Sequence, residues 1–138
     1  MKSGKMVAMG MLLACVSMGS VACNVEKQED IKVRDIEFTV LKESEIPEDI
    51  MELVDEKKNE EFRLAKTKDS YTYVLAGYGK QETGGFSIQV EDIYLGENAV
   101  YVDTELMGPA KNEKVSEAES YPFIVVKMEH TDEPIIFK

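Results

Sequence analysis

From Phe62 onward the chain repeatedly alternates apolar with polar residues at a period of two. This pattern is typical of strands that bury one face and leave the other in water. Short turn sequences, such as Lys68-Asp69 and Gly96-Glu97-Asn98, separate neighbouring runs and predict hairpins. The chain should therefore form mainly antiparallel β-structure, with runs at residues 62–64, 71–78, 86–95, 99–106, 123–128 and 135–137.

Residues 45–58 change to a helical period. Pro47 suits the first turn of a helix, Glu48 and Asp49 suit its positive end, and Lys57 and Lys58 suit its negative end. An earlier alternating run at 33–41 predicts a first strand. The predicted fold is therefore α+β, with an antiparallel sheet of five or six strands and the helix 47–58 packed on one face. An all-β sandwich is the alternative.

The N-terminus has the layout of an export signal. Residues 6–22 hold no charged residue and directly follow Lys2 and Lys5. Ser20-Val21-Ala22 precedes Cys23 with small residues, which resembles the lipobox where bacterial lipoproteins are lipidated and cut. Cutting at Cys15 is the alternative, but it would leave the apolar residues 16–22 on the mature protein. The length of the run also allows an uncleaved membrane anchor. We predict lipidation of Cys23.

This assignment divides the chain into a signal peptide (1–22), the lipidated cysteine with a polar tether (23–30) and one globular domain (31–138). No thiol remains in that domain for a disulfide, a zinc site or a nucleophile. Removing Lys2 and Lys5 from the 16 basic residues leaves 14 against 27 acidic ones, a formal charge of −13. Such a charge disfavours nucleic acid as a partner. We expect an extracytoplasmic domain anchored to a bacterial membrane through lipid only.

Catalytic and ligand-binding patterns are weak. His130 could act as a base for Ser87 or Ser120, but no nucleophile elbow surrounds either serine. The glycines of residues 77–85 lack phosphate-loop spacing and are followed by a strand instead of a helix. Asp103 and Glu105 fit a solvated strand face better than a metal site. The sequence therefore predicts no enzyme, no cofactor and no metal.

One loop stands out as a candidate for binding a partner. Thr83-Gly84-Gly85-Phe86 places two glycines directly before a strand, where they can hold a backbone shape that other residues cannot adopt. The loop could be no more than a tight turn. Alternatively, it could be a rigid tip that presents Thr83 and Phe86 to another protein. Thr83, Gly84, Gly85 and Phe86 are the predicted partner-binding residues.

A family resemblance begins at these same residues. Tyr71-Thr72-Tyr73-Val74-Leu75, Gly79, Lys80 and Thr83-Gly84-Gly85-Phe86 resemble the C-terminal domain of the protease complex subunit PrcB family. The similarity continues through Pro109 and Tyr121-Pro122 and covers residues 71–128. The family usually has tyrosine where this chain has Phe86, so any hydrogen bond from that hydroxyl is lost. The resemblance implies a lipid-anchored accessory subunit that associates with a secreted protease, stabilises it and has no catalytic residues.

Two other functions remain open. The Thr83–Phe86 loop is also similar to one loop of chagasin-like cysteine-protease inhibitors, whose other binding loops are absent here. A small-ligand-binding lipoprotein, with a pocket between the helix and the sheet, is the second. It would need a large apolar cavity with convergent polar groups.

Overall fold

Within residues 31–138, the fold consists of two four-stranded sheets and one α-helix. The computed structural model describes residues 31–138, so the predicted signal peptide, Cys23 and the tether lie outside the described residues. We call the sheet β2-β6-β7-β9 the outer sheet and the sheet β3-β8-β5-β4 the middle sheet. The strands are β2 (Arg34–Asp35), β3 (Phe38–Val40), β4 (Glu61–Lys68), β5 (Tyr71–Tyr78), β6 (Ser87–Leu95), β7 (Val100–Met107), β8 (Phe123–Glu129) and β9 (Ile135–Phe137).

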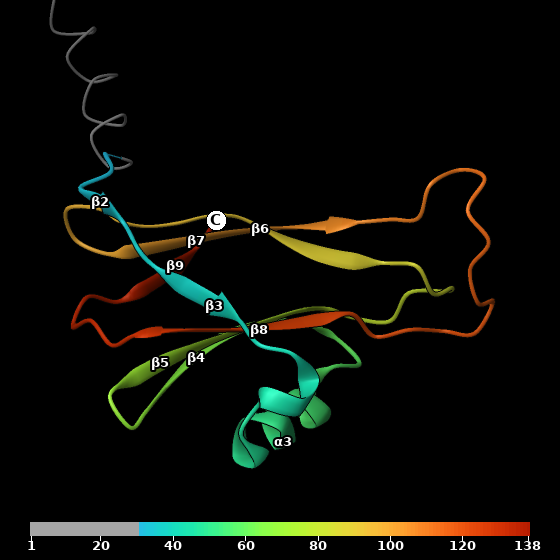
Figure 1. Cartoon of the computed structure of the whole chain (residues 1–138), viewed down its shortest axis with the longest axis horizontal. Helices are drawn as coiled ribbons and strands as arrows, with labels where there is room; N and C mark the ends of the chain where they lie inside the picture. The colour runs from blue at the N-terminus through green and yellow to red at the C-terminus, as the bar shows by residue number, and fades with distance from the viewer. Residues whose placement is uncertain (1–30) are drawn as a thin grey trace, which may run out of the picture.

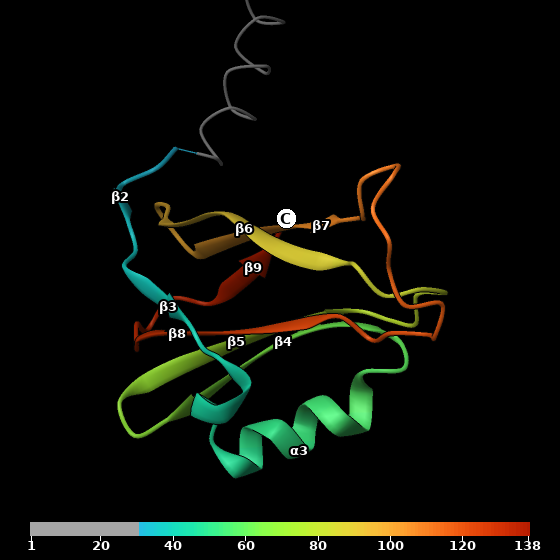
Figure 2. The ribbon, with the colours of Figure 1, turned by 45° about the vertical axis from the view of Figure 1, so that its right-hand side comes forward.

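The elements are arranged in three layers (Figures 1 and 2), with the middle sheet between the outer sheet and helix α3 (Glu48–Lys57). The predicted α+β character is confirmed, with one helix packed on a sheet. The prediction of a single sheet with five or six strands is wrong, because the strands divide equally between two sheets. Alternation reveals that a strand has a buried face but does not reveal which sheet that strand joins.

The middle sheet is covered on both faces. In β5, Val74 and Ala76 pack in the core between the two sheets, whereas Tyr73 and Leu75 pack against the helix side. Strand β8 follows the same alternation, with Val126 between the sheets and Val125 towards the helix. A strand buried on both faces needs a nearly continuous apolar run, and both strands have one.

Helix α3 begins one residue after the predicted start and ends one residue before the predicted end. Pro47 is its N-cap residue, Glu48 and Asp49 lie in its first turn, and Lys57 lies in its last. Charges of these signs stabilise the corresponding ends of the helix. Its apolar side packs on the middle sheet in a cluster whose buried members are Ile50, Val54, Tyr73, Leu75 and Val125.

The predicted first strand at 33–41 divides into two. Strand β2 pairs with Tyr94 and Leu95 of the outer sheet, and β3 pairs with β8 of the middle sheet. Ile36 lies at the crossing, is 7% exposed, and donates its backbone N–H to Ile93 O at 3.1 Å. The segment therefore closes one side of the two-sheet stack, instead of running along one sheet as predicted.

Both hairpins predicted from turn sequences form, although the first turns one residue later than Lys68-Asp69. Asp69 and Ser70 turn between β4 and β5 with φ of 52° and 71°, the left-handed region that two-residue hairpin turns require. Gly96 donates its N–H to Ala99 O at 2.8 Å in the turn between β6 and β7. The last strand departs from the predicted antiparallel arrangement, because β9 pairs in parallel with β7. It follows β8 of the middle sheet, so the chain crosses to the outer sheet before β9 begins.

Candidate functional site

Two connections between the sheets lie at the same end of the molecule. Residues 79–86 lead from β5 in the middle sheet to β6 in the outer sheet, and residues 108–122 lead from β7 back to β8. Figure 1 shows both segments at the end remote from the β6–β7 hairpin. We call them together the two-loop tip. It contains all four residues that the sequence proposed for partner binding.

Backbone hydrogen bonds fasten one loop of the tip to the other. Gln81 and Ser120 exchange two bonds, at 2.8 Å and 3.0 Å, and Gly84 N–H donates to Ser116 O at 2.8 Å. The Ser120 hydroxyl adds a bond to Thr83 O at 2.7 Å. A loop held at several points along its length has few backbone conformations left to lose on binding. The two-loop tip is therefore a preorganised surface.

The side chain of Thr83 turns back onto its own loop. Its hydroxyl donates to Gly84 O at 3.0 Å, and the residue is half-buried. Phe86 is half-buried as well, and its ring lies beside Gly108, where an added Cβ would come within 3.3 Å of the ring. Both side chains therefore shape the tip, and each leaves only part of its surface for a partner.

The two glycines of the tip have different roles. Gly85 has φ of +88°, and a Cβ there would clash with the Val115 side chain and lie 3.0 Å from Pro109 Cβ. Gly84 lies outside the left-handed region, and its Cβ would meet Ser116 Cβ at an ordinary 3.4 Å. Gly85 is thus required by the backbone and by the packing of the second loop, whereas the position of Gly84 accepts a small side chain.

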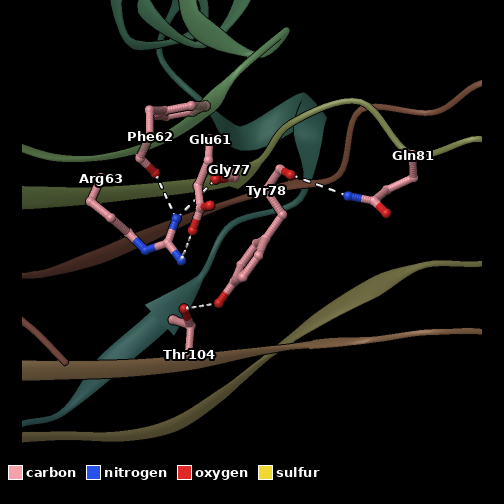
Figure 3. Close-up of polar contacts among 7 residues, drawn as sticks. All are labelled: Glu61, Phe62, Arg63, Gly77, Tyr78, Gln81 and Thr104. Atoms are coloured by element: carbon pink, nitrogen blue, oxygen red, sulfur yellow. Dashed lines mark hydrogen bonds and ion pairs between the residues drawn. The ribbon is translucent and has the colours of Figure 1, made fainter.

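A polar cluster braces the base of the tip (Figure 3). The Arg63 guanidinium donates to Phe62 O and Gly77 O, each at 2.9 Å, and lies over the Tyr78 ring, 4.3 Å from its centroid. The Tyr78 hydroxyl is bonded to Thr104 Oγ1 at 2.7 Å, across from the middle sheet to the outer sheet. Sequence analysis missed this cluster. The sequence held one indication of this cluster, which was Arg63 at a strand position that faces the space between the sheets.

The side chain amide of Gln81 extends that brace into the loop. It donates from Nε2 to Tyr78 O at 3.1 Å, one residue before the loop begins (Figure 3). The same residue forms the backbone bridge to Ser120. The tip is therefore joined to the inter-sheet cluster by short-range contacts.

The structure does not bring His130 to either serine. Ser120 and His130 lie beyond opposite ends of β8, and the Ser120 hydroxyl donates a hydrogen bond to Thr83 O within the tip. The imidazole Nδ1 lies 3.1 Å from the Thr72 hydroxyl and 3.3 Å from that of Thr67. His130 is an exposed residue that caps the far end of the middle sheet.

Carboxylates collect on the solvent face of the outer sheet. A hydrogen bond to Glu105, followed by desolvation and by the charges of Glu105 and Asp103, raises the pKa of Glu91 above its ordinary value. Glu91 stands at a bulge, where the register of β6 against β7 shifts between Val90 and Asp92. Within residues 31–138 no group of three or more His, Cys, Asp or Glu is arranged to hold a metal ion.

Two open grooves border strand β3. The larger, of about 960 Å³, runs beside β3 and the end of β8. The smaller, of about 370 Å³, opens between β3 and the start of β6, and we call it the apolar groove; it is lined by Val40, Leu41, Glu43, Ile46, Ser87, Ile88, Tyr121, Pro122, Phe123, Ile124 and Val125. The interface between helix and sheet, where the alternative of a small-ligand-binding lipoprotein would need its pocket, is packed with apolar side chains.

Comparison with known families identifies one part of the chain. Residues 72–129 match the family model described as PrcB C-terminal. The predicted resemblance to this family is confirmed over these residues. No curated protein and no solved structure matches the chain.

The PrcB C-terminal segment corresponds to a definite part of the fold. It begins in β5, ends with β8, and includes β6, β7 and the whole two-loop tip. Helix α3 and strands β2, β3, β4 and β9 lie outside it. The family segment therefore consists of the two central strands of each sheet together with the loops that join them.

Proposed function

We propose that this chain is a non-enzymatic lipoprotein that binds a secreted protease and acts as its accessory or stabilising subunit. The observation that carries the proposal is the PrcB C-terminal match, which spans the entire two-loop tip. In this proposal the chain is exported, lipid on Cys23 holds it at the bacterial membrane, and the domain 31–138 faces outward. Within the described residues no helix is long and apolar enough to span a bilayer.

The construction of the tip supports a binding role. Its two loops are joined by backbone bonds and braced through Tyr78 to the space between the sheets. Rigid loops lose less conformational entropy on association, so more of the contact energy contributes to affinity. Glu82 and Gly85 are exposed there, and Lys80 pairs with Glu119 at 3.3 Å on the surface. The Thr83–Phe86 loop also underlies the alternative of a chagasin-like inhibitor, but the family match favours the accessory subunit.

A crosslinked pull-down of the full lipoprotein from its own cells tests the proposal. Wild-type protein should recover a secreted protease, and a Cys23→Ser form should recover less of it because the anchor is lost. Glu82→Arg in the tip should also reduce recovery, whereas Glu56→Arg, the same charge change on the exposed face of helix α3, should not. If no protein partner is recovered in repeated trials, the proposal fails.

A further inference from the structure

Half of strand β6 has a free edge. Its partner on that side, β2, pairs only with Tyr94 and Leu95, and two flanking bonds join Val33 N–H to Leu95 O and Ile36 N–H to Ile93 O. From Ser87 to Glu91 no described strand lies beside this edge of β6. A row of unpaired backbone N–H and C=O groups is a template for another extended chain.

The apolar groove lies directly beneath this edge. Ser87 and Ile88 form one wall of the groove, and Val40, Ile46 and Ile124 contribute to the other side. Val40 is 47% exposed even though it belongs to a strand of the middle sheet. An extended segment beside β6 would point every second side chain into this groove, because side chains alternate between the faces of a strand.

The other face of such a segment would meet the carboxylates of the outer sheet. Glu91 is the last residue of the free edge, and Glu105 and Asp103 lie beside it on β7. Their mutual proximity disfavours the fully charged state of the cluster, as the raised pKa of Glu91 indicates. Lysine or arginine side chains placed there would relieve this repulsion and contribute specificity.

We propose that the Ser87–Glu91 edge of β6, with the apolar groove beneath it, docks an extended segment of the protein partner in which apolar residues alternate with basic ones. This inference rests on the proposed function and specifies where and how the partner binds. It places main-chain hydrogen bonds along β6, apolar side chains in the groove and basic side chains over Glu91 and Glu105. Strand addition of this kind derives affinity from the backbone and specificity from the alternating side chains.

The docking edge is continuous with the two-loop tip. Thr83–Phe86 leads directly into Ser87, and Tyr121 and Pro122 of the second loop line the apolar groove. A strand that occupies the edge would therefore reach the tip at one end. This continuity gives the tip a physical role as the stop that sets the register of the docked segment.

A peptide-binding measurement on the full-length chain tests the chemistry. The probe is a short synthetic peptide that alternates valine with lysine, and its matched control alternates valine with glutamate. Only the lysine peptide should bind. Glu91→Lys should weaken it about ten-fold by charge repulsion, whereas Glu97→Lys, the same change in the β6–β7 hairpin, should leave it nearly unchanged. Equal binding of both peptides, or equal loss in both variants, would overturn the inference.

Photo-crosslinking in the native cells tests the location. A photoreactive phenylalanine analogue replaces Ser87 at the edge, Glu82 at the tip or Glu56 on helix α3 in the lipidated protein. A crosslink from Ser87 to an alternating apolar and basic peptide of the protease partner supports the inference. Crosslinks to the protease from Glu82 alone would overturn it and leave the proposed function standing. Absence of protein crosslinks at all three positions would reject both, and a crosslink from Ser87 to another copy of this chain would overturn the strand-docking inference.

Discussion

The two sheets of this domain differ in how many of their faces are buried. The middle sheet has the outer sheet on one face and helix α3 on the other, and its strand β5 has six consecutive buried residues from Thr72 to Gly77. The outer sheet has one covered face, and half of β6 has a free edge. We therefore expect the middle sheet to contribute more to stability, whereas the outer sheet leaves one polar face and part of a backbone edge exposed.

The largest expected loss of stability comes from a Leu→Ala substitution, which can be made in both sheets and compared. Leu75→Ala removes a fully buried side chain between the middle sheet and the helix, and it should lower the free energy of unfolding by about 3 kcal/mol through lost burial and a cavity. Leu106→Ala, at a half-buried position of the outer sheet, should cost about 1 kcal/mol. Urea denaturation of both variants gives the comparison. Equal losses would contradict the proposed division between the sheets.

The next effect concerns the tip that joins the sheets. Gly85→Ala should destabilise the protein by about 2 kcal/mol, since the backbone is left-handed and the new Cβ meets Val115 and Pro109. Gly84→Ala should cost only about 0.5 kcal/mol or less, because its Cβ makes an ordinary contact with Ser116. Thermal unfolding and amide exchange at Gln81 and Ser120 report the difference. Replacing both glycines by valine would disturb the fold at Gly85, so a loss of binding could not be assigned to the contact itself. Gly84→Ala is therefore the better probe of binding.

A smaller effect should come from the hydrogen bond between the sheets. Tyr78→Phe deletes the bond to Thr104 and should cost about 1 kcal/mol, the usual net contribution of a partly buried hydrogen bond. A double-mutant cycle with Thr104→Val isolates the coupling between the two hydroxyls. Tyr121→Phe is the control, because its hydroxyl makes only an exposed 3.4 Å contact with Glu119. No coupling in the cycle would show that the sheets do not depend on this bond.

The smallest effect should appear in the pH dependence of the outer sheet. The pKa of Glu91 is raised in the folded state, so folding favours its protonated form and stability from this group declines as the pH rises from the ordinary glutamate pKa through the raised value. Glu91→Gln should therefore stabilise the protein at neutral pH and lose that advantage in acid. Chemical denaturation across this range, with Glu97→Gln as the control, measures the effect. A variant that is less stable at neutral pH would contradict the repulsion.

Local patterns predicted the local elements well. Pro47, Glu48 and Asp49 located the start of helix α3, and the turn sequences located two hairpins, because capping, charge at helix ends and turn conformations depend on neighbouring residues. The Arg63–Tyr78–Thr104 cluster had no comparable signal. Its members lie on three different strands, and the Tyr78–Thr104 contact forms only when the two sheets stack.

The sequence by itself determined that residues 31–138 would form one helix and several strands in which apolar and polar residues alternate. It also identified the segment that matches the PrcB C-terminal family. Only the tertiary structure decided that 33–41 divides between two sheets, that β9 pairs in parallel with β7, and that the Thr83–Phe86 loop bonds to residues 116–120. The physical reason is that periodicity reports which side of a strand avoids water. Which partner covers that side depends on contacts between residues far apart in the chain.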